Sequence, residues 1–185
     1  MRSLLSLLGL GSGTAEQTSA AETETVRKIM ARLEALPRDQ ARYIAAFAYI
    51  LGRVAHADLE ISAEETQAME TLVMRHGKLA PEQAVLVVEI AKSQNRLFGG
   101  TESFLVTREL GKLVGAPERQ ELLRCLFAVS AADGSISAEE EHQIRQIADE
   151  LNIPRETYVA IRSEYSDQRS VIQGLIARDS ATAGC

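Results

Sequence analysis

The feature that most constrains this chain is a short turn that occurs twice in the sequence. The second copy, 131–140, reads Ala-Ala-Asp-Gly-Ser-Ile-Ser-Ala-Glu-Glu, and the first copy, 56–65, precedes it with a constant offset of 75 residues from Asp58 to Asp133. Each copy ends in Ser followed three residues later by Glu, which is the spacing of a capping box at a helix start. The sequence therefore predicts two helix–turn–helix units of the same design.

The inward-facing positions behind the two turns repeat in the same phase. In the first unit, the residues expected on the buried stripe of the helix are Met69, Leu72, Val73 and His76. The same offset of 75 gives the corresponding residues of the second unit, which are Ile144, Ile147, Ala148 and Leu151. Two units that share a turn, a cap and a stripe are expected to pack about a pseudo-twofold axis. We therefore expect an all-α fold, a single bundle of about seven to eight helices with an internal duplication.

Apolar periodicity, caps and prolines predict helices along most of the chain. Helices are expected over 21–36, 38–57, 101–114 and 118–132, and further helices begin after Ser62, Ser137 and at Pro81 and Pro154. The Val-rich run 85–88 is compatible with a strand, but no other strand is predicted for it to pair with, so we favour a helix.

These helices predict one domain with two flanking segments. We expect a flexible leader over 1–23, a helical domain over 24–167 whose repeat halves are about 38–94 and 116–167, and a partly disordered extension over 168–185. Hydrophobic residues make up 45% of the chain and aromatic residues only 4%, with no Trp, so the core must be aliphatic. Such a composition suits helix-on-helix packing.

The net charge of −6 is concentrated at the two turns. Segments 58–70 and 133–150 each carry a net charge of −5, so the rest of the chain is net positive. This acidity argues against a nucleic-acid partner. It favours a protein partner that docks on the side of the molecule that carries these acidic segments. The sequence gives no indication of the oligomeric state.

Cysteine usage and hydropathy indicate an intracellular protein. The two cysteines, Cys125 and Cys185, do not form a disulfide framework, and no apolar run approaches the roughly 20 residues of a membrane-spanning helix. We expect a cytoplasmic protein. We also expect the Leu-rich residues 1–10 to make a weak contact with the inner face of the membrane.

Asp58 and Asp133 continue the buried stripe of the helix that precedes each of them, so we expect both carboxylates to point inward. Each also lies at a helix C-terminus, where the helix dipole disfavours an anion. Two partners can compensate such a charge: the backbone N–H groups of an Asx-type turn, or a bound cation. The residues leave these two interpretations open.

Glu65 and Glu140 occupy the third position of the capping boxes, where each side chain reaches back to the N-cap backbone. A carboxylate keeps acceptor capacity after one such bond, so each can also join the nearby Asp in holding an ion. Asp58, Glu65, Asp133 and Glu140 are therefore the predicted metal ligands. All-oxygen ligation favours Ca²⁺, Mg²⁺ or Mn²⁺ over Zn²⁺. A standard EF-hand is excluded, because Val129 and Ala131 would occupy its first ligand positions.

No catalytic arrangement is visible in the sequence. No phosphate-binding loop, Cys-x-x-Cys pair, or Ser–His–Asp spacing is present, and the three histidines do not repeat between the two units. We therefore expect a protein that is not an enzyme and that uses no organic cofactor.

The doubled Asp-x-x-Ile-Ser-x-Glu-Glu, with an apolar helix behind each copy, resembles the TerB family of tellurite-resistance-associated helical domains. The resemblance covers roughly 38–167. The copy at 131–140 fits closely, whereas the first copy has Leu59 and Glu60 where the family often has Gly and an acid. The resemblance implies an all-helical, internally duplicated domain that binds metal through acidic residues on one side. It also implies a role in responses to tellurite and other stresses, near the inner face of the membrane.

Two hypotheses follow. In the first, the chain is a metal-binding stress-response module. In the second, it is a metal-independent helical scaffold whose acidic face recruits a protein, and Glu65 and Glu140 serve only as helix caps.

Overall fold

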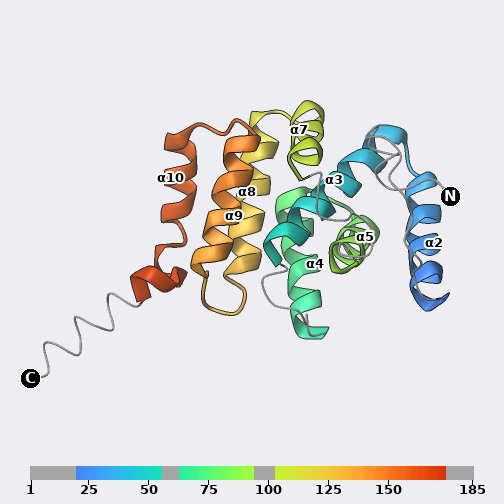
Figure 1. Cartoon of the computed structure of the whole chain (residues 1–185), viewed down its shortest axis with the longest axis horizontal. Coiled ribbons are helices and arrows are strands. Elements are labelled where there is room, and N and C mark those ends of the chain that lie inside the picture. The colour runs from blue at the N-terminus through green and yellow to red at the C-terminus, as the bar shows by residue number, and fades with distance from the viewer. Residues whose placement is uncertain (1–19, 56–62, 94–102, 174–185) are drawn as a thin grey trace, which may run out of the picture.

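The fold is taken from a computed structural model, which describes residues 20–55, 63–93 and 103–173. These residues form a row of packed helices (Figure 1), and they contain no β-strand longer than an isolated bridge. The helices are α2 (Ala20–Glu34), α3 (Arg38–Ala55), α4 (Ala63–Gly77), α5 (Pro81–Lys92), α7 (Ser103–Leu113), α8 (Ala116–Ser130), α9 (Ala138–Glu150), α10 (Arg155–Ser163) and the short 3₁₀ helix η1 (Ser166–Gln168). The predicted all-α fold is confirmed.

Local sequence sets where these helices begin. Pro81 is the first residue of α5, and Pro117 lies in the first turn of α8, positions that tolerate a residue without a backbone N–H. The Val-rich run 85–88 lies inside α5, so the helical interpretation was correct. Asn152, with φ of 55°, ends the turn after α9 in the left-handed region that Asn tolerates.

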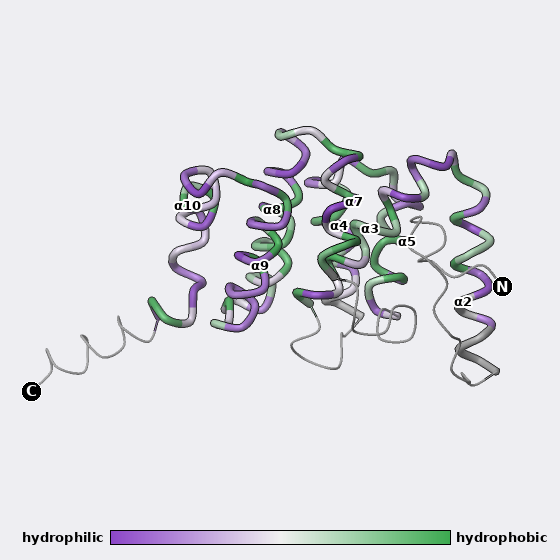
Figure 2. Tube along the Cα trace, turned by 45° about the horizontal axis from the view of Figure 1, so that its top comes forward, coloured by the Kyte–Doolittle hydropathy of each residue, from purple (hydrophilic) through white to green (hydrophobic). Residues whose placement is uncertain are grey.

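Helix α3 forms the centre of the core. It packs against α5 and α7 and also contacts α8 and α9, while α4 packs between α5 and α8. The consecutive residues 44–52 are all buried, which shows that α3 is covered on every side. The small side chains of Ala45, Ala46 and Ala48 let the neighbouring helices approach the axis of α3 closely. The large, fully buried side chain of Phe47 fills space between α3 and these helices. Apolar residues accordingly follow the inside of the row in Figure 2.

The two predicted stripes face the core. Met69 and Val73 of α4 are buried, with Leu72 and His76 half-buried beside them. All four residues of the matching stripe after the second turn are buried: Ile144, Ile147, Ala148 and Leu151. The pseudo-twofold arrangement of the two units stays a prediction, because residues 56–62 of the first turn lie outside the described residues.

Two arginines join helices that are distant in the sequence. Arg53 of α3 donates to Thr107 of α7 at 3.1 Å and pairs with Glu150 of α9 at 2.7 Å. Arg119 of α8 donates to the carbonyl oxygens of Val114 and Leu151, at 3.3 and 3.0 Å, and also to that of Gly111. The bonds from Arg119 satisfy carbonyl groups at helix ends, which have no partner within their own helix.

Several sequence predictions lie outside the described residues. They include most of the flexible leader predicted over 1–23, most of the C-terminal extension and the environment of Cys185, whereas α2 already begins at Ala20 and Cys125 is buried in α8. Within the described residues, no helix is both long and apolar enough to cross a bilayer.

Candidate functional site

The turn between α8 and α9 is built around Asp133 and Gly134. The N–H of Gly134 donates to the carbonyl oxygen of Ala131 at 2.9 Å, and Gly134 adopts a φ of 93°, which is accessible to glycine. One carboxylate oxygen of Asp133, Oδ1, accepts a hydrogen bond from the N–H of Ser135 at 2.9 Å. Asp133 therefore forms an Asx turn, the backbone alternative that the sequence left open.

The carboxylate of Asp133 is exposed, so the prediction that it points inward is wrong. The prediction extended the buried stripe of α8 beyond Val129 with helical spacing. The helix ends at Ser130, however, and residues 131–133 form a turn, so the helical period no longer sets the direction of the side chain. An exposed anion retains its hydration, and the argument that burial requires a compensating cation therefore does not apply at Asp133.

Ser137 and Glu140 form the predicted capping box at the start of α9. The N–H of Ser137 donates to Glu140 Oε2 at 2.8 Å, and the N–H of Glu140 donates to Ser137 Oγ at 3.2 Å. The capping role of Glu140 is confirmed. Glu140 Oε1 and Asp133 Oδ2 are the carboxylate oxygens that these backbone bonds leave available.

The segment that follows α10 is hydrogen-bonded to the turn between α8 and α9. The sequence did not predict this contact. The N–H of Ile136 donates to the carbonyl oxygen of Gln168 at 2.6 Å, and the N–H of Ser170 donates to that of Ile136 at 2.9 Å. Gln173 Nε2 also donates to the carbonyl oxygen of Gly134 at 3.1 Å. The carbonyl oxygens of Gly134 and Ile136 are thus already hydrogen-bonded to this segment.

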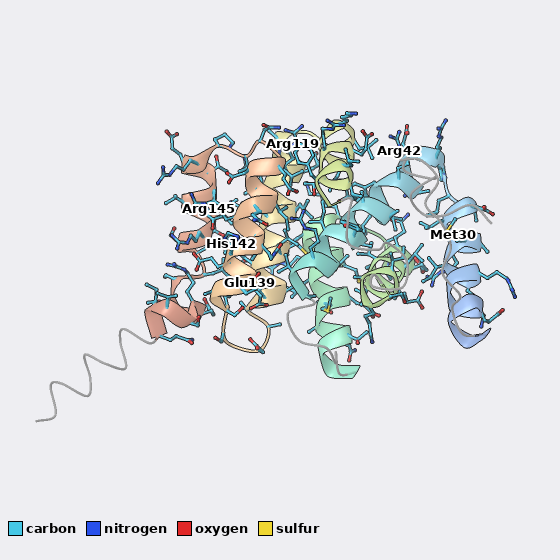
Figure 3. All side chains as sticks on the ribbon, in the orientation of Figure 1. Met30, Arg42, Arg119, Glu139, His142 and Arg145 are labelled. Carbon is cyan, nitrogen blue, oxygen red and sulfur yellow. The ribbon has the colours of Figure 1, made fainter. Side chains whose placement is uncertain are left out.

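Neighbouring acids at the start of α9 differ sharply in how their charge is compensated. Within the described ranges, Asp133, Glu139 and Glu140 form no ion pair, and Glu139 accepts only a hydrogen bond from Gln143 at 3.3 Å. Asp133 and Glu139 are exposed, and Glu140 is half-buried. We call these three residues the acidic face (Figure 3 labels Glu139). Its charge is uncompensated by any described basic side chain.

Glu141, the next residue, is compensated twice. Its carboxylate accepts from Arg169 Nε at 2.7 Å and from Arg169 Nη2 at 3.1 Å, and it pairs closely with Arg162. Burial raises the pKa of Glu141, but the bonds from Arg169 and Arg162 outweigh that effect, so its pKa lies below its ordinary value. Glu141 is therefore an ionised structural acid, and its charge is not available to a ligand.

The structure describes the side chains of only two of the four predicted metal ligands, Asp133 and Glu140. Asp58 lies outside the described residues, and Glu65 lies in α4, but its side chain is not described. Among the described side chains, no group of three or more His, Cys, Asp or Glu residues has an arrangement that could hold a metal ion. Asp133 and Glu140 are thus the two predicted ligands whose side chains the structure describes, and each uses one carboxylate oxygen in a backbone hydrogen bond.

The family model described as Tellurite resistance protein TerB matches residues 44–163, which is well over half of the chain. This chain belongs to the TerB family. The matched span of this TerB-family chain begins within α3 and reaches the last residue of α10, so it includes both turns. No curated protein and no solved structure gives a significant match to it. At the family level, the chain is a helical module of the tellurite-resistance type.

Proposed function

We propose that this TerB-family chain is a non-enzymatic, cytoplasmic stress-response module that binds a hydrated divalent cation at the acidic face. One observation carries the proposal: Asp133 in the turn, and Glu139 and Glu140 in the first turn of α9 that follows it, have no described basic partner, whereas Glu141 beside them has two. Like charges that gather without compensation favour a counterion. The available oxygens belong to carboxylates, so the preferred ions are Ca²⁺, Mg²⁺ and Mn²⁺.

The geometry favours weak binding by a few ligands. Asp133 and Glu140 each use one carboxylate oxygen for the backbone, and the carbonyl oxygens of Gly134 and Ile136 have partners in the C-terminal segment. With so few protein ligands, we expect a Kd on the order of 10⁻⁴–10⁻³ M. Asp58 and Glu65 are proposed as the ligands of an equivalent site at the first turn.

The proposal is tested by calorimetric titration of the full chain with Ca²⁺, Mg²⁺ and Mn²⁺. The informative variant is Asp133→Asn with Glu140→Gln, because both amides keep the acceptor oxygen of the Asx turn and of the capping box while removing the charge. The matched control is Asp149→Asn, an exposed acid at the other end of α9. We expect the double variant to lose the heat of binding and the control to retain it.

A second function is favoured by the completed backbone bonds of Asp133 and Glu140. Because the turn and the cap account for both residues, the acidic face could instead dock a basic segment of a protein without any ion. In that case a basic peptide binds in the presence of a chelator, and its affinity falls steeply with salt concentration. Asp133→Asn with Glu140→Gln then weakens peptide binding, and added cations compete with the peptide instead of promoting binding.

A further inference from the structure

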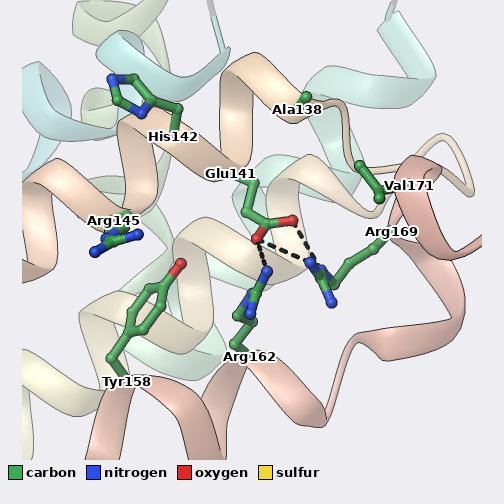
Figure 4. Close-up of a pocket in the computed structure, with 8 residues that line it drawn as sticks. All are labelled: Ala138, Glu141, His142, Arg145, Tyr158, Arg162, Arg169 and Val171. Carbon is green, nitrogen blue, oxygen red and sulfur yellow. Dashed lines mark hydrogen bonds and ion pairs between the residues drawn. The ribbon is translucent and has the colours of Figure 1, made fainter. Parts of the chain in front are cut away.

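A pocket of about 350 Å³ lies between α9, α10 and the segment that follows η1 (Figure 4). From its lining we infer that it binds a phosphate-type dianion. The residues at its centre are Arg145 of α9, Arg162 of α10 and Arg169, together with Glu141 and the hydroxyl group of Tyr158. This site is distinct from the acidic face and does not depend on the proposed cation.

The charge of the pocket is opposite to that of the chain. Three arginines against one glutamate give the lining a net charge of +2 when His142 is neutral, whereas the whole chain carries −6. A dianion would neutralise this local charge. A phosphomonoester carries about −1.5 to −2 at pH 7, so its charge fits the pocket. Arginine is also the side chain whose planar group best matches phosphate oxygens.

Glu141 holds two of the arginines in place and leaves them with donors to spare. It accepts two N–H bonds from Arg169 and pairs with Arg162, out of five N–H groups on each guanidinium. In addition, Arg162 Nε is buried without a hydrogen-bond partner in the structure. Fixing the two side chains before binding reduces the entropy lost when an anion is captured.

Arg145 and Tyr158 contribute donors for which no hydrogen-bond partner is found among the described residues. Arg145 is exposed and forms no ion pair with any described residue. The Tyr158 side chain is largely buried, and in Figure 4 its hydroxyl group points into the space beside Arg145. Burial raises the pKa of Tyr158, so the hydroxyl stays protonated at neutral pH and can donate to an anion.

The size of the pocket sets the class of ligand. At about 350 Å³, the pocket lies at the small end of the range for ligand sites. Ala138 and Val171 supply apolar atoms to its lining, and Val171 is half exposed. The pocket therefore suits inorganic phosphate or the phosphate group of a small metabolite.

The test is calorimetric titration of the full chain at neutral pH with inorganic phosphate and, separately, with glycerol 3-phosphate. Each titration is compared with NaCl of equal ionic strength. Arg145→Gln removes an exposed, unpaired charge, and Arg155→Gln makes the same change on an exposed arginine of α10 outside the pocket. Tyr158→Phe keeps the buried ring and removes only the hydroxyl.

We expect saturable phosphate binding that Arg145→Gln weakens by about tenfold to a hundredfold and that Arg155→Gln leaves unchanged. Tyr158→Phe should weaken binding to a smaller extent. Tighter binding of glycerol 3-phosphate would indicate an esterified ligand, and equal or weaker binding would indicate the free anion. A heat no larger than that of NaCl, or equal losses for Arg145→Gln and Arg155→Gln, would overturn the inference.

Discussion

Arg169 donates two hydrogen bonds to the carboxylate of Glu141, of 2.7 and 3.1 Å. This pair connects the segment that follows η1 to the first turn of α9. Each of these two side chains is only 14% exposed. The main-chain bridge between Ile136 and residues 168–170 lies directly beside this pair. The pair therefore fixes both the turn that carries the acidic face and one wall of the phosphate pocket.

We predict that Glu141→Gln lowers the free energy of unfolding by about 1–3 kcal/mol, because it leaves the largely buried Arg169 and the partly buried Arg162 without this counter-charge. Urea unfolding followed by circular dichroism measures the change. Glu156→Gln, an exposed acid in the first turn of α10, serves as the control and should change stability by less than about 0.5 kcal/mol. Equal losses in the two variants would contradict this role of Glu141.

The same pair predicts how stability depends on pH. The pKa of Glu141 is lower in the folded chain than its ordinary value of about 4.5, so the folded state binds this proton less readily than the unfolded state does. The stabilisation is therefore complete above the unfolded pKa and is lost as the pH falls through the folded pKa. The difference in unfolding free energy between wild type and Glu141→Gln should be constant near neutral pH and shrink below about pH 4.5. A difference that grows on acidification would refute this prediction.

Arg119→Lys should destabilise the protein by about 1–3 kcal/mol, although the charge is kept. The planar guanidinium of Arg119 reaches the carbonyl oxygens of Val114 and Leu151 at once, and also that of Gly111. A single ammonium group cannot span carbonyl groups at the ends of two helices. The thermal midpoint measures the loss, and Arg155→Lys on the exposed side of α10 is the matched control, which should leave the midpoint unchanged.

Gly134→Ala should lower the free energy of unfolding by about 1–2 kcal/mol through backbone strain. Gly134 has a φ of 93°, and no atom lies within 4 Å of the position that a Cβ would take, so a steric overlap does not contribute. Gly134→Asn should be milder, because Asn tolerates positive φ better than Ala. Chemical denaturation of the two variants checks this order, and an Ala variant as stable as wild type would show that the turn adopts another conformation.

Much of the helical architecture could be predicted because it depends on local signals. The period of the buried residues located the inward faces of α4 and α9, and the Ser137–Glu140 spacing marked the first residue of α9. The short motif Asp-x-x-Ile-Ser-x-Glu-Glu, present in two copies, also resembled the TerB family, and the family model confirms that membership over residues 44–163. These features require only residues that are close in the sequence.

The candidate sites were harder to predict because they depend on contacts between distant segments. Asp133 was expected inside the bundle, since nothing in its spacing shows that α8 ends at Ser130. The bond from Gln173 to Gly134 joins residues that lie 39 positions apart. The phosphate pocket draws on two helices and a following segment, and no short motif relates Arg145 to Arg169.

The central claim is that a divalent cation binds at the acidic face. The most direct measurement is the broadening of backbone amide NMR signals by substoichiometric Mn²⁺ in the full chain. We predict that broadening centres on residues 133–140, with a second centre at 58–65 if the first turn is equivalent, and that Asp133→Asn with Glu140→Gln abolishes it at 133–140. Broadening that spreads equally over isolated surface acids such as Asp149 and Glu156, and that the double variant does not change, would contradict the claim.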